Sequence, residues 1–131
     1  MAALSKKKQR ILVVDDDPDI LEMYGLLLRE AGYEVDQAEH ALAAVAAVVR
    51  NAPDVILADL RMPIVDGMGL AEELKSHADS RQIPLVAVTG YDAPGSREAA
   101  RKAGYDEYLT KPIDAGQFPK QIAQIIARHS R

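Results

Sequence analysis

Carboxylates follow two apolar runs of the sequence, and together these carboxylates could bind a cation. Asp15, Asp16 and Asp17 come directly after the run ILVV, and Asp59 follows the run VILA. Carboxylates that lie close together cannot all stay ionised at low cost unless a cation joins them. A hard divalent ion with oxygen ligands, above all Mg²⁺, suits such a group. If the two runs are neighbouring strands, these residues predict a magnesium site.

A hydroxyl and an ammonium group follow two later runs. Thr89 comes after LVAV, and Lys111 comes after EYLT. In phosphoryl transfer, a metal ion and a lysine neutralise charge on the phosphoryl oxygens, and a carboxylate nucleophile can form an aspartyl phosphate. The strand ends therefore predict a phosphoryl-transfer site, provided that they meet at one rim of a sheet.

Short apolar runs alternate with helical patterns along the chain. Three runs, Ile11–Val14, Val55–Ala58 and Leu85–Val88, are typical of parallel strands covered on both faces. Tyr33–Ala38 and Tyr105–Thr110 are more polar and predict weaker strands. The alternation predicts an α/β fold, a doubly wound parallel sheet with right-handed crossovers, in which ligands bind beyond the carboxyl ends of the strands.

The first two of five helical stretches have clear apolar residues. Asp17 is expected to cap the first helix, with Pro18 at its first position and Gly32 just past its end. The helical spacing predicts two inward faces. They comprise Ile20, Tyr24, Leu28 and Ala31 in the first helix, and Leu42, Val45, Ala46 and Val49 in the second.

The remaining helices are less regular. The third is expected to open at Asp66-Gly67 and to turn Leu70 and Leu74 inward. The fourth, over residues 93–103, has only alanines as anchors and should be the most weakly held. Pro119 lies within the apolar pattern of the last helix, so this helix should begin near Pro119 or be kinked there.

The composition limits the possible classes of protein. A chain of 131 residues with 48% apolar and 27% charged residues fits one globular domain, expected over residues 10–131. Its net charge of -4 argues against nucleic acid as a direct partner. The apolar runs are too short for a membrane span or a signal-peptide core, so we expect a cytoplasmic location and no membrane partner. Residues 1–9 are interpreted as a solvated tail rather than a phosphate-seeking arm.

Four motifs together resemble the response-regulator receiver domains of two-component signalling. They are ILVVDDDPDIL, DLRMPIVDG, AVTGYD and EYLTKP, which occur in the family's order and at its intervals from about Arg10 to the last helix. The resemblance implies a flavodoxin-like sheet of five strands in the order 2-1-3-4-5, flanked by five helices. It also implies a phosphorylated signalling protein that catalyses its own phosphotransfer and dephosphorylation but is not an enzyme for other substrates.

The resemblance assigns a role to each residue of the acidic group. Asp59 is similar to the phosphoacceptor, which takes a phosphoryl group from a phosphohistidine on a sensor histidine kinase or a histidine phosphotransfer protein. Asp16 and Asp59, with the backbone carbonyl of Arg61, are similar to the direct Mg²⁺ ligands of the family. Asp15 matches the acidic residue that acts mainly through a metal-bound water.

The resemblance also covers the other side of the expected site. Lys111 would pair with the phosphoryl group, and Thr89 would donate to a phosphoryl oxygen and draw its loop inward. Tyr108 matches an aromatic residue that turns inward as Thr89 moves and so remodels a binding face for a downstream protein. The alternative is that Tyr108 simply covers the core, and we favour the switching role. The peptide bond between Lys111 and Pro112 matches one that is often cis. A phosphorylation-dependent dimer is left open.

Two other functions are alternatives to a receiver. The run VVDDDPDIL also resembles haloacid-dehalogenase-type phosphatases, in which Asp15 would attack and Asp17 would donate a proton. That family needs an acidic pair beyond the lysine, where only Asp114 stands, and it leaves Asp59 without a role. An unphosphorylated receiver-like binding module would typically lose the acceptor or Lys111, and this chain keeps both. Whether the receiver stands alone or belongs to a longer protein is left open.

Overall fold

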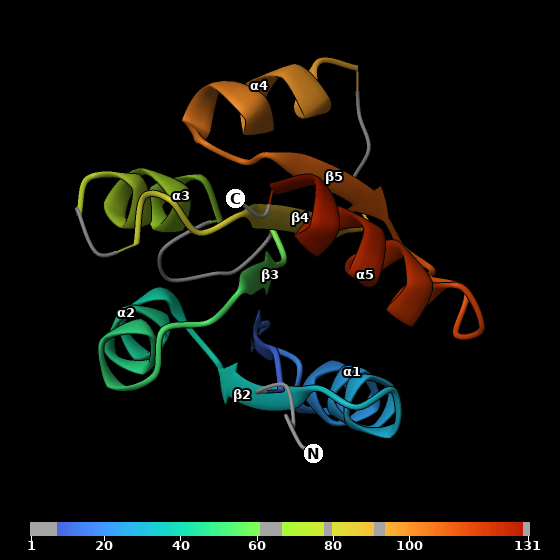
Figure 1. Ribbon diagram of the computed structural model, residues 1–131. Coiled ribbons are helices and arrows are strands. Elements are labelled where there is room, and N and C mark those ends of the chain that lie inside the picture. The colour runs from blue at the N-terminus through green and yellow to red at the C-terminus, as the bar shows by residue number, and fades with distance from the viewer. Residues whose placement is uncertain (1–7, 61–66, 78–79, 91–93, 130–131) are drawn as a thin grey trace.

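A computed structural model describes residues 8–60, 67–77, 80–90 and 94–129 as an open parallel sheet between two layers of helices (Figure 1). In chain order the elements are β1 (Arg10–Val14), α1 (Pro18–Glu30), β2 (Glu34–Ala38), α2 (Ala41–Arg50), β3 (Val55–Ala58), α3 (Gly67–Lys75), β4 (Leu85–Thr89), α4 (Ser96–Ala103), β5 (Glu107–Thr110) and α5 (Phe118–His129). The predicted strands and helices are therefore confirmed, with ends shifted by a few residues.

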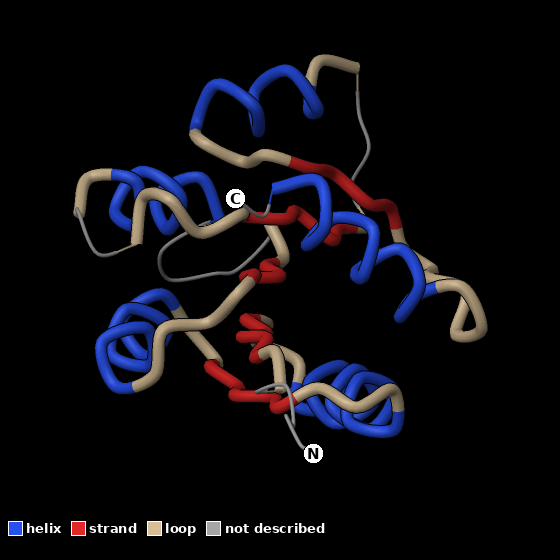
Figure 2. Tube along the Cα trace, in the orientation of Figure 1, coloured by secondary structure: helices blue, strands red, loops and turns tan. Residues whose placement is uncertain are grey.

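The five strands are all parallel and lie in the order β2-β1-β3-β4-β5, as the resemblance implies. Helices α1 and α5 cover one face of the sheet, and α2, α3 and α4 cover the other (Figure 2). Val14, the last residue of β1, pairs with Ala38 of β2 and Ala58 of β3. Because β1 and β3 end at the same level, the residues that follow them emerge side by side at the carboxyl edge.

Alternate side chains of the central strands enter two separate cores. In β1, Ile11 and Val13 pack under α1 and α5, while Leu12 and Val14 pack under the helices of the other face. This burial on both faces explains why the central strands are continuous apolar runs instead of alternating ones. Phe118 of α5 lies within the first core, where its ring meets that of Tyr24 at a centroid distance of 4.9 Å.

The ends of α1 and α5 follow the local signals of the sequence. The Asp17 carboxylate accepts a hydrogen bond of 2.9 Å from the backbone N–H of Asp19, which makes Asp17 the N-cap of α1 as predicted. Gly32, just past the end of α1, has a φ of 102°, a conformation that favours glycine. Helix α5 begins at Phe118, so Pro119 stands in its first turn, where its missing N–H is not needed.

The inward faces of α1 and α3 agree largely with the prediction. Tyr24 and Leu28 of α1 are buried, but Ile20 is only half-buried and Ala31 is exposed, because the helix ends at Glu30. Leu21 and Gly25 complete the buried face of α1. In α3, Leu70 and Leu74 are buried as expected. Asp66, the expected opening of α3, lies outside the described residues.

The predicted inward face of α2 is wrong for three of its four residues, because only Val45 is half-buried and packs against the core. Leu42 and Val49 are 79% and 77% exposed, and Ala46 is exposed as well. The buried residues are Ala41, Ala44, Ala47 and Val48. Because the helix is apolar on all sides, spacing alone does not single out one face. The small alanines lie inward because they let α2 pack closely on β1 and β2.

Helix α4 is the most sparsely anchored helix of the sheet's second face. Its buried residues are Ser96 and Ala100, and it ends at Gly104 with a φ of 126°. The predicted scarcity of apolar anchors is therefore confirmed within residues 96–103. No helix of the described residues is long and apolar enough to span a membrane.

We expect Gly104→Ala to destabilise the protein more than Gly32→Ala. Both glycines have a positive φ, so a Cβ costs about 1–2 kcal/mol at either position. At Gly104 a Cβ would also stand 2.8 Å from Cγ of Lys75, whereas nothing lies within 4 Å of a Cβ at Gly32. The free energy of unfolding in urea should fall by about 1 kcal/mol more for Gly104→Ala, as expected of overpacking. Equal losses in the two variants would contradict this packing argument.

Candidate functional site

The sheet brings the predicted site residues to one rim. The backbone N–H of Asp15 donates to the carbonyl of Ala38 at 3.1 Å, and that of Asp59 donates to the carbonyl of Val14 at 3.2 Å. These bonds continue the parallel ladder one residue beyond β1 and β3, so the backbones that carry the two carboxylates are fixed. On the other side of the rim, the N–H of Lys111 donates to the carbonyl of Thr89 at 2.9 Å.

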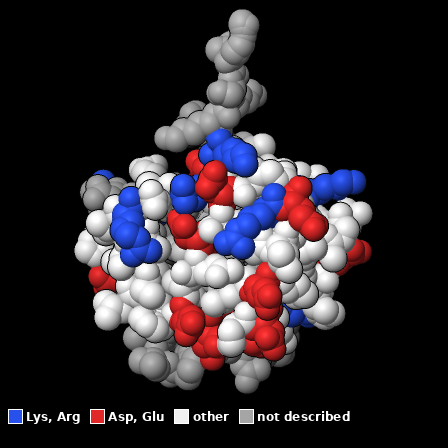
Figure 3. Space-filling model, turned by 90° about the horizontal axis from the view of Figure 1, so that it is seen from below, with Lys and Arg blue, Asp and Glu red and all other residues white. Residues whose placement is uncertain are grey.

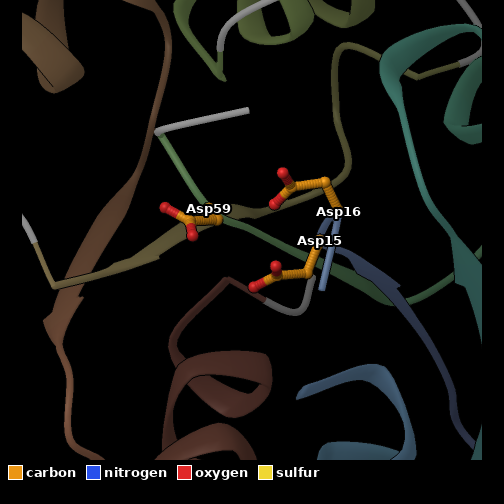
Figure 4. A group of neighbouring side chains, drawn as sticks. All are labelled: Asp15, Asp16 and Asp59. Atoms are coloured by element: carbon orange, nitrogen blue, oxygen red, sulfur yellow. The ribbon is translucent and has the colours of Figure 1, made fainter. Parts of the chain in front are cut away.

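The carboxylates of Asp15, Asp16 and Asp59 form a compact cluster at the ends of β1 and β3 (Figure 4). Each offers one oxygen, and these oxygens all lie within 4.8 Å of one another. The three residues differ in their exposure to solvent: Asp15 is buried, Asp59 is half-buried and Asp16 is exposed. Three oxygen donors that are open to solvent on one side fit a hard divalent ion that keeps part of its water.

The ammonium of Lys111 balances two of these charges. Its Nζ lies 3.1 Å from Oδ2 of Asp15 and 3.1 Å from Oδ2 of Asp59. Burial alone would lower the pKa of Lys111, but the hydrogen bonds and charges of Asp59 and Asp15 raise this pKa above its usual value. Lys111 is therefore held in its charged form next to the carboxylate of Asp59.

Asp15 is the least solvated member of the cluster. Burial raises the pKa of its carboxyl, and the negative charge of Asp59 adds to this effect. The backbone N–H of Asp17, which donates to Oδ1 of Asp15 at 3.0 Å, and the charge of Lys111 act in the opposite direction. Because burial prevails, the ionised cluster is electrostatically unfavourable without a further cation, which supports the metal site predicted from the sequence.

Tyr24 is a neighbour of the cluster that the sequence identified only as a core residue. Burial raises the pKa of its phenol, and the charges of Lys111, Asp15 and Asp59 also act on it. Its ring forms part of the core below the rim, against Phe118. The helical spacing of α1 places Tyr24 on the inward face, but no sequence signal indicates that this position lies near the cluster.

Thr89 and Tyr108 connect the rim to α4 through the last two strands. Thr89 ends β4 and is fully buried, whereas Tyr108 of β5 is half-buried and packs against the second core. The hydroxyl of Tyr108 lies 3.0 Å from Oγ of Ser96 in the first turn of α4. The guanidinium of Arg97 stands over the Tyr108 ring, 4.5 Å from its centroid. The side chain of Tyr108 thus both covers the core and contacts α4. This position is compatible with a switching role and with a purely structural role.

The structure describes one of the two remaining features of the predicted site, the peptide bond after Lys111, but not Arg61. The peptide bond between Lys111 and Pro112 is cis, as the resemblance implies. Arg61, whose carbonyl was expected to bind Mg²⁺, lies outside the described residues.

An open parallel sheet in the order 2-1-3-4-5 with polar groups at its carboxyl edge defines a flavodoxin-like fold. Within that class, the family described as the response regulator receiver domain matches residues 11–123. The chain therefore belongs to the response-regulator receiver family. This membership sets aside the phosphatase alternative, and the carboxylate of Asp17, the acid of that alternative, caps α1.

Similar proteins include a transcriptional regulator and solved receiver domains. The DNA-binding dual master transcriptional regulator RpaA of Synechocystis is 33% identical over 122 residues, which are 93% of this chain but only 51% of that protein. A CheY-like receiver domain protein of Methanospirillum hungatei is 28% identical, with a TM-score of 0.86 over 94% of this chain and 97% of its own. The receiver domain of a Pseudomonas aeruginosa sensor histidine kinase, solved with a magnesium ion in its active site cleft, is 30% identical, with a TM-score of 0.83 over 92% and 99%.

We expect Lys111→Met to destabilise the metal-free protein, because it leaves the carboxylates of Asp15 and Asp59 without the ammonium that pairs with both. Breaking a buried ion pair costs about 3–5 kcal/mol, and the partial exposure of Lys111 should reduce this cost to about 2 kcal/mol. Urea unfolding in the presence of a chelator measures the loss. Lys120→Met, at an exposed position of α5, is the control and should change the free energy of unfolding little.

A double variant tests whether repulsion causes the loss. Adding Asp15→Asn to Lys111→Met removes one of the two unpaired charges, so the double variant should be more stable than Lys111→Met alone. Additive losses from the two single changes would argue against the charge balance described here.

Proposed function

We propose that this chain is a phosphoacceptor receiver in which Asp59 accepts a phosphoryl group from a phosphohistidine. The main support is that the carboxylate of Asp59 lies 3.1 Å from the ammonium of Lys111 and within the cluster of Asp15 and Asp16. A carboxylate oxygen of Asp59 forms a bond to phosphorus as the phosphorus–nitrogen bond to histidine breaks. The electron pair of that bond stays on the imidazole, which becomes neutral as it binds a proton.

The cluster would hold Mg²⁺ during this transfer. Oxygen atoms of Asp16 and Asp59, with the carbonyl of Arg61, are proposed as direct ligands, and Asp15 would act mainly through a metal-bound water. When bound, the ion would offset negative charge on the phosphoryl oxygens. Lys111 would neutralise further charge on the phosphoryl group, since its ammonium stands 3.1 Å from Oδ2 of Asp59.

The response to phosphorylation is proposed to pass through Thr89 and Tyr108. The Thr89 hydroxyl would donate to a phosphoryl oxygen and draw the end of β4 toward Asp59. Tyr108, which is bonded to Ser96 and stacked under Arg97, would then change its contact with α4. Because α4 has few buried anchors, a small bias in free energy could shift it. This shift would alter the face that a downstream protein binds.

The proposed partners are a sensor histidine kinase or histidine phosphotransfer protein, which supplies the phosphoryl group, and a downstream protein. The chain would act as a signalling protein that catalyses its own phosphotransfer and dephosphorylation. We assign this function to a domain over residues 10–131 that follows a tail over residues 1–9. A cytoplasmic location and a phosphorylation-dependent dimer remain part of the proposal.

We expect Asp59→Asn to abolish phosphorylation. With a small phosphodonor and Mg²⁺, the wild type should gain the mass of one phosphoryl group, and Asp59→Asn should gain none because it lacks the nucleophile. Intact-mass spectrometry measures the gain. Asp17→Asn is the matched control, since Asp17 caps α1 outside the cluster and its loss should leave the labelling intact. Labelling of Asp59→Asn to the wild-type extent would refute the assignment of the acceptor.

Mg²⁺ should bind and stabilise the wild-type protein. An ion that binds the folded state alone stabilises it by about 2.7 kcal/mol at a hundredfold excess over its dissociation constant. Asp16→Asn should weaken this binding at least about tenfold, because a carboxylate ligand loses its charge. Calorimetric titration and unfolding with and without a chelator measure both effects. Asp19→Asn, in the first turn of α1, is the control, and an equal loss there would indicate a general effect of surface charge.

A further inference from the structure

The outward face of α2 carries a stripe of apolar side chains, here called the α2 stripe. It consists of the exposed residues Leu42, Ala46 and Val49, beside Val45, which is half-buried and also packs against the second core. Leu42 and Val49 stand two helical turns apart on the same side and are 79% and 77% exposed. These are larger exposures than those of Met23 and Leu26, the other large exposed apolar residues of the described chain. A contiguous apolar patch of this kind is typical of a surface that another molecule covers.

Charged residues stand only at the two ends of the α2 stripe. Glu39 directly precedes the N-cap of α2, and Arg50 is the last residue of the helix. Both side chains are exposed, and neither forms an ion pair or a hydrogen bond with another described residue. The helix itself has no acidic residue. Figure 3, in which α2 lies on the left, shows a mostly uncharged left flank between cations near the top and carboxylates nearer the bottom.

We propose that the α2 stripe binds the same stripe of a second copy of this chain, with the two helices antiparallel. A twofold axis near Val45 and Ala46 would place Leu42 of one copy against Val49 of the other. Ala46 is small, so the two helices can approach closely at the axis. The same axis would place Arg50 of each copy beside Glu39 of its partner, which gives two equivalent ion pairs.

The distribution of charge favours this occupant and this orientation. A twofold contact requires a surface that is complementary to itself, and a stripe with opposite charges at its two ends meets that requirement when the helices are antiparallel. A parallel pair would place Arg50 against Arg50 and Glu39 against Glu39, which is repulsive. This inference is independent of the proposed phosphorylation, because it involves neither the acidic rim nor α4.

The size of the surface sets the expected affinity. An α-helix of 10 residues is about 15 Å long, so a contact centred on α2 covers less than a standard interface of about 1,600 Å². A small apolar contact with two exposed ion pairs should give a reversible dimer with a dissociation constant of about 10–500 μM. The dimer should therefore form in concentrated solution and dissociate on dilution.

Sedimentation velocity of the full chain between about 5 and 500 μM tests the dimer. The wild-type sedimentation coefficient should rise with concentration, and Leu42→Glu with Val49→Glu should raise the dissociation constant at least about tenfold, because it buries like charges. Leu26→Glu is the control: Leu26 is exposed on α1, which covers the opposite face of the sheet, so dimerisation should not change. Circular dichroism checks that all variants are folded.

A charge exchange tests the antiparallel orientation. Glu39→Arg alone and Arg50→Glu alone should each weaken the dimer about threefold to tenfold, because each places like charges together. The double variant Glu39→Arg with Arg50→Glu restores opposite charges and should return to within about threefold of the wild type. A wild type that is monomeric at all concentrations, dimers unaffected by the changes at Leu42 and Val49, or no recovery in the double variant would each overturn the proposal.

Discussion

The close approach of like charges at the ends of β1 and β3 is the constraint on which the rest of the structure depends. These strands are parallel neighbours in register, and the ladder continues into the residues that bear the carboxylates. Asp15 and Asp59 are therefore held side by side by backbone hydrogen bonds and cannot separate without breaking the edge of the sheet. Two unit charges about 4 Å apart repel by about 4 kcal/mol at an effective dielectric constant of 20. The fold must supply a comparable attraction at the same place.

Lys111, which follows the edge strand β5, supplies part of that attraction. It follows β5, which is separated from β3 by β4, so the ion pairs with Asp15 and Asp59 form only when β1, β3, β4 and β5 are in order. With its three carboxylates ionised, the cluster would keep two net negative charges after pairing with Lys111, which equals the charge of one divalent cation. A site with this balance responds strongly to a bound cation or to an added phosphoryl group.

The sequence predicted the site well where a residue that could do chemistry directly follows a clear strand or precedes a clear helix start. The apolar runs predicted the strands, and the residues after them predicted the acidic rim, because parallel strands deliver their carboxyl ends to one edge. Asp17 was separable from Asp15 and Asp16 because Pro18 marks a helix start. The position of Tyr24 near the rim could not be predicted, since periodicity gives the face of a helix but not its height over a sheet.

The contact between Tyr108 and Ser96 was unpredictable for a related reason. It joins β5 to the first turn of α4, and α4 has too few anchors for its position to be inferred from apolar spacing. Where packing is strong, as for α3, the inward residues followed the helical pattern. Local sequence therefore predicted that α4 exists and has few anchors, but not the polar contact that joins it to β5.

The failed prediction for α2 has a different cause and a physical consequence. A helix that is apolar all round can bury either its large or its small residues, and burying Leu42 and Val49 would remove more apolar surface from water than burying alanines. Three alanines and Val48 lie inward instead, and the small alanines let α2 pack closely on β1 and β2. The free energy available from Leu42 and Val49 is then not used within the monomer. This free energy contributes to stability when another molecule covers that face. The opposite charges of Glu39 and Arg50 lie at the two ends of the face, so a second, antiparallel copy would both cover the apolar side chains and pair the charges.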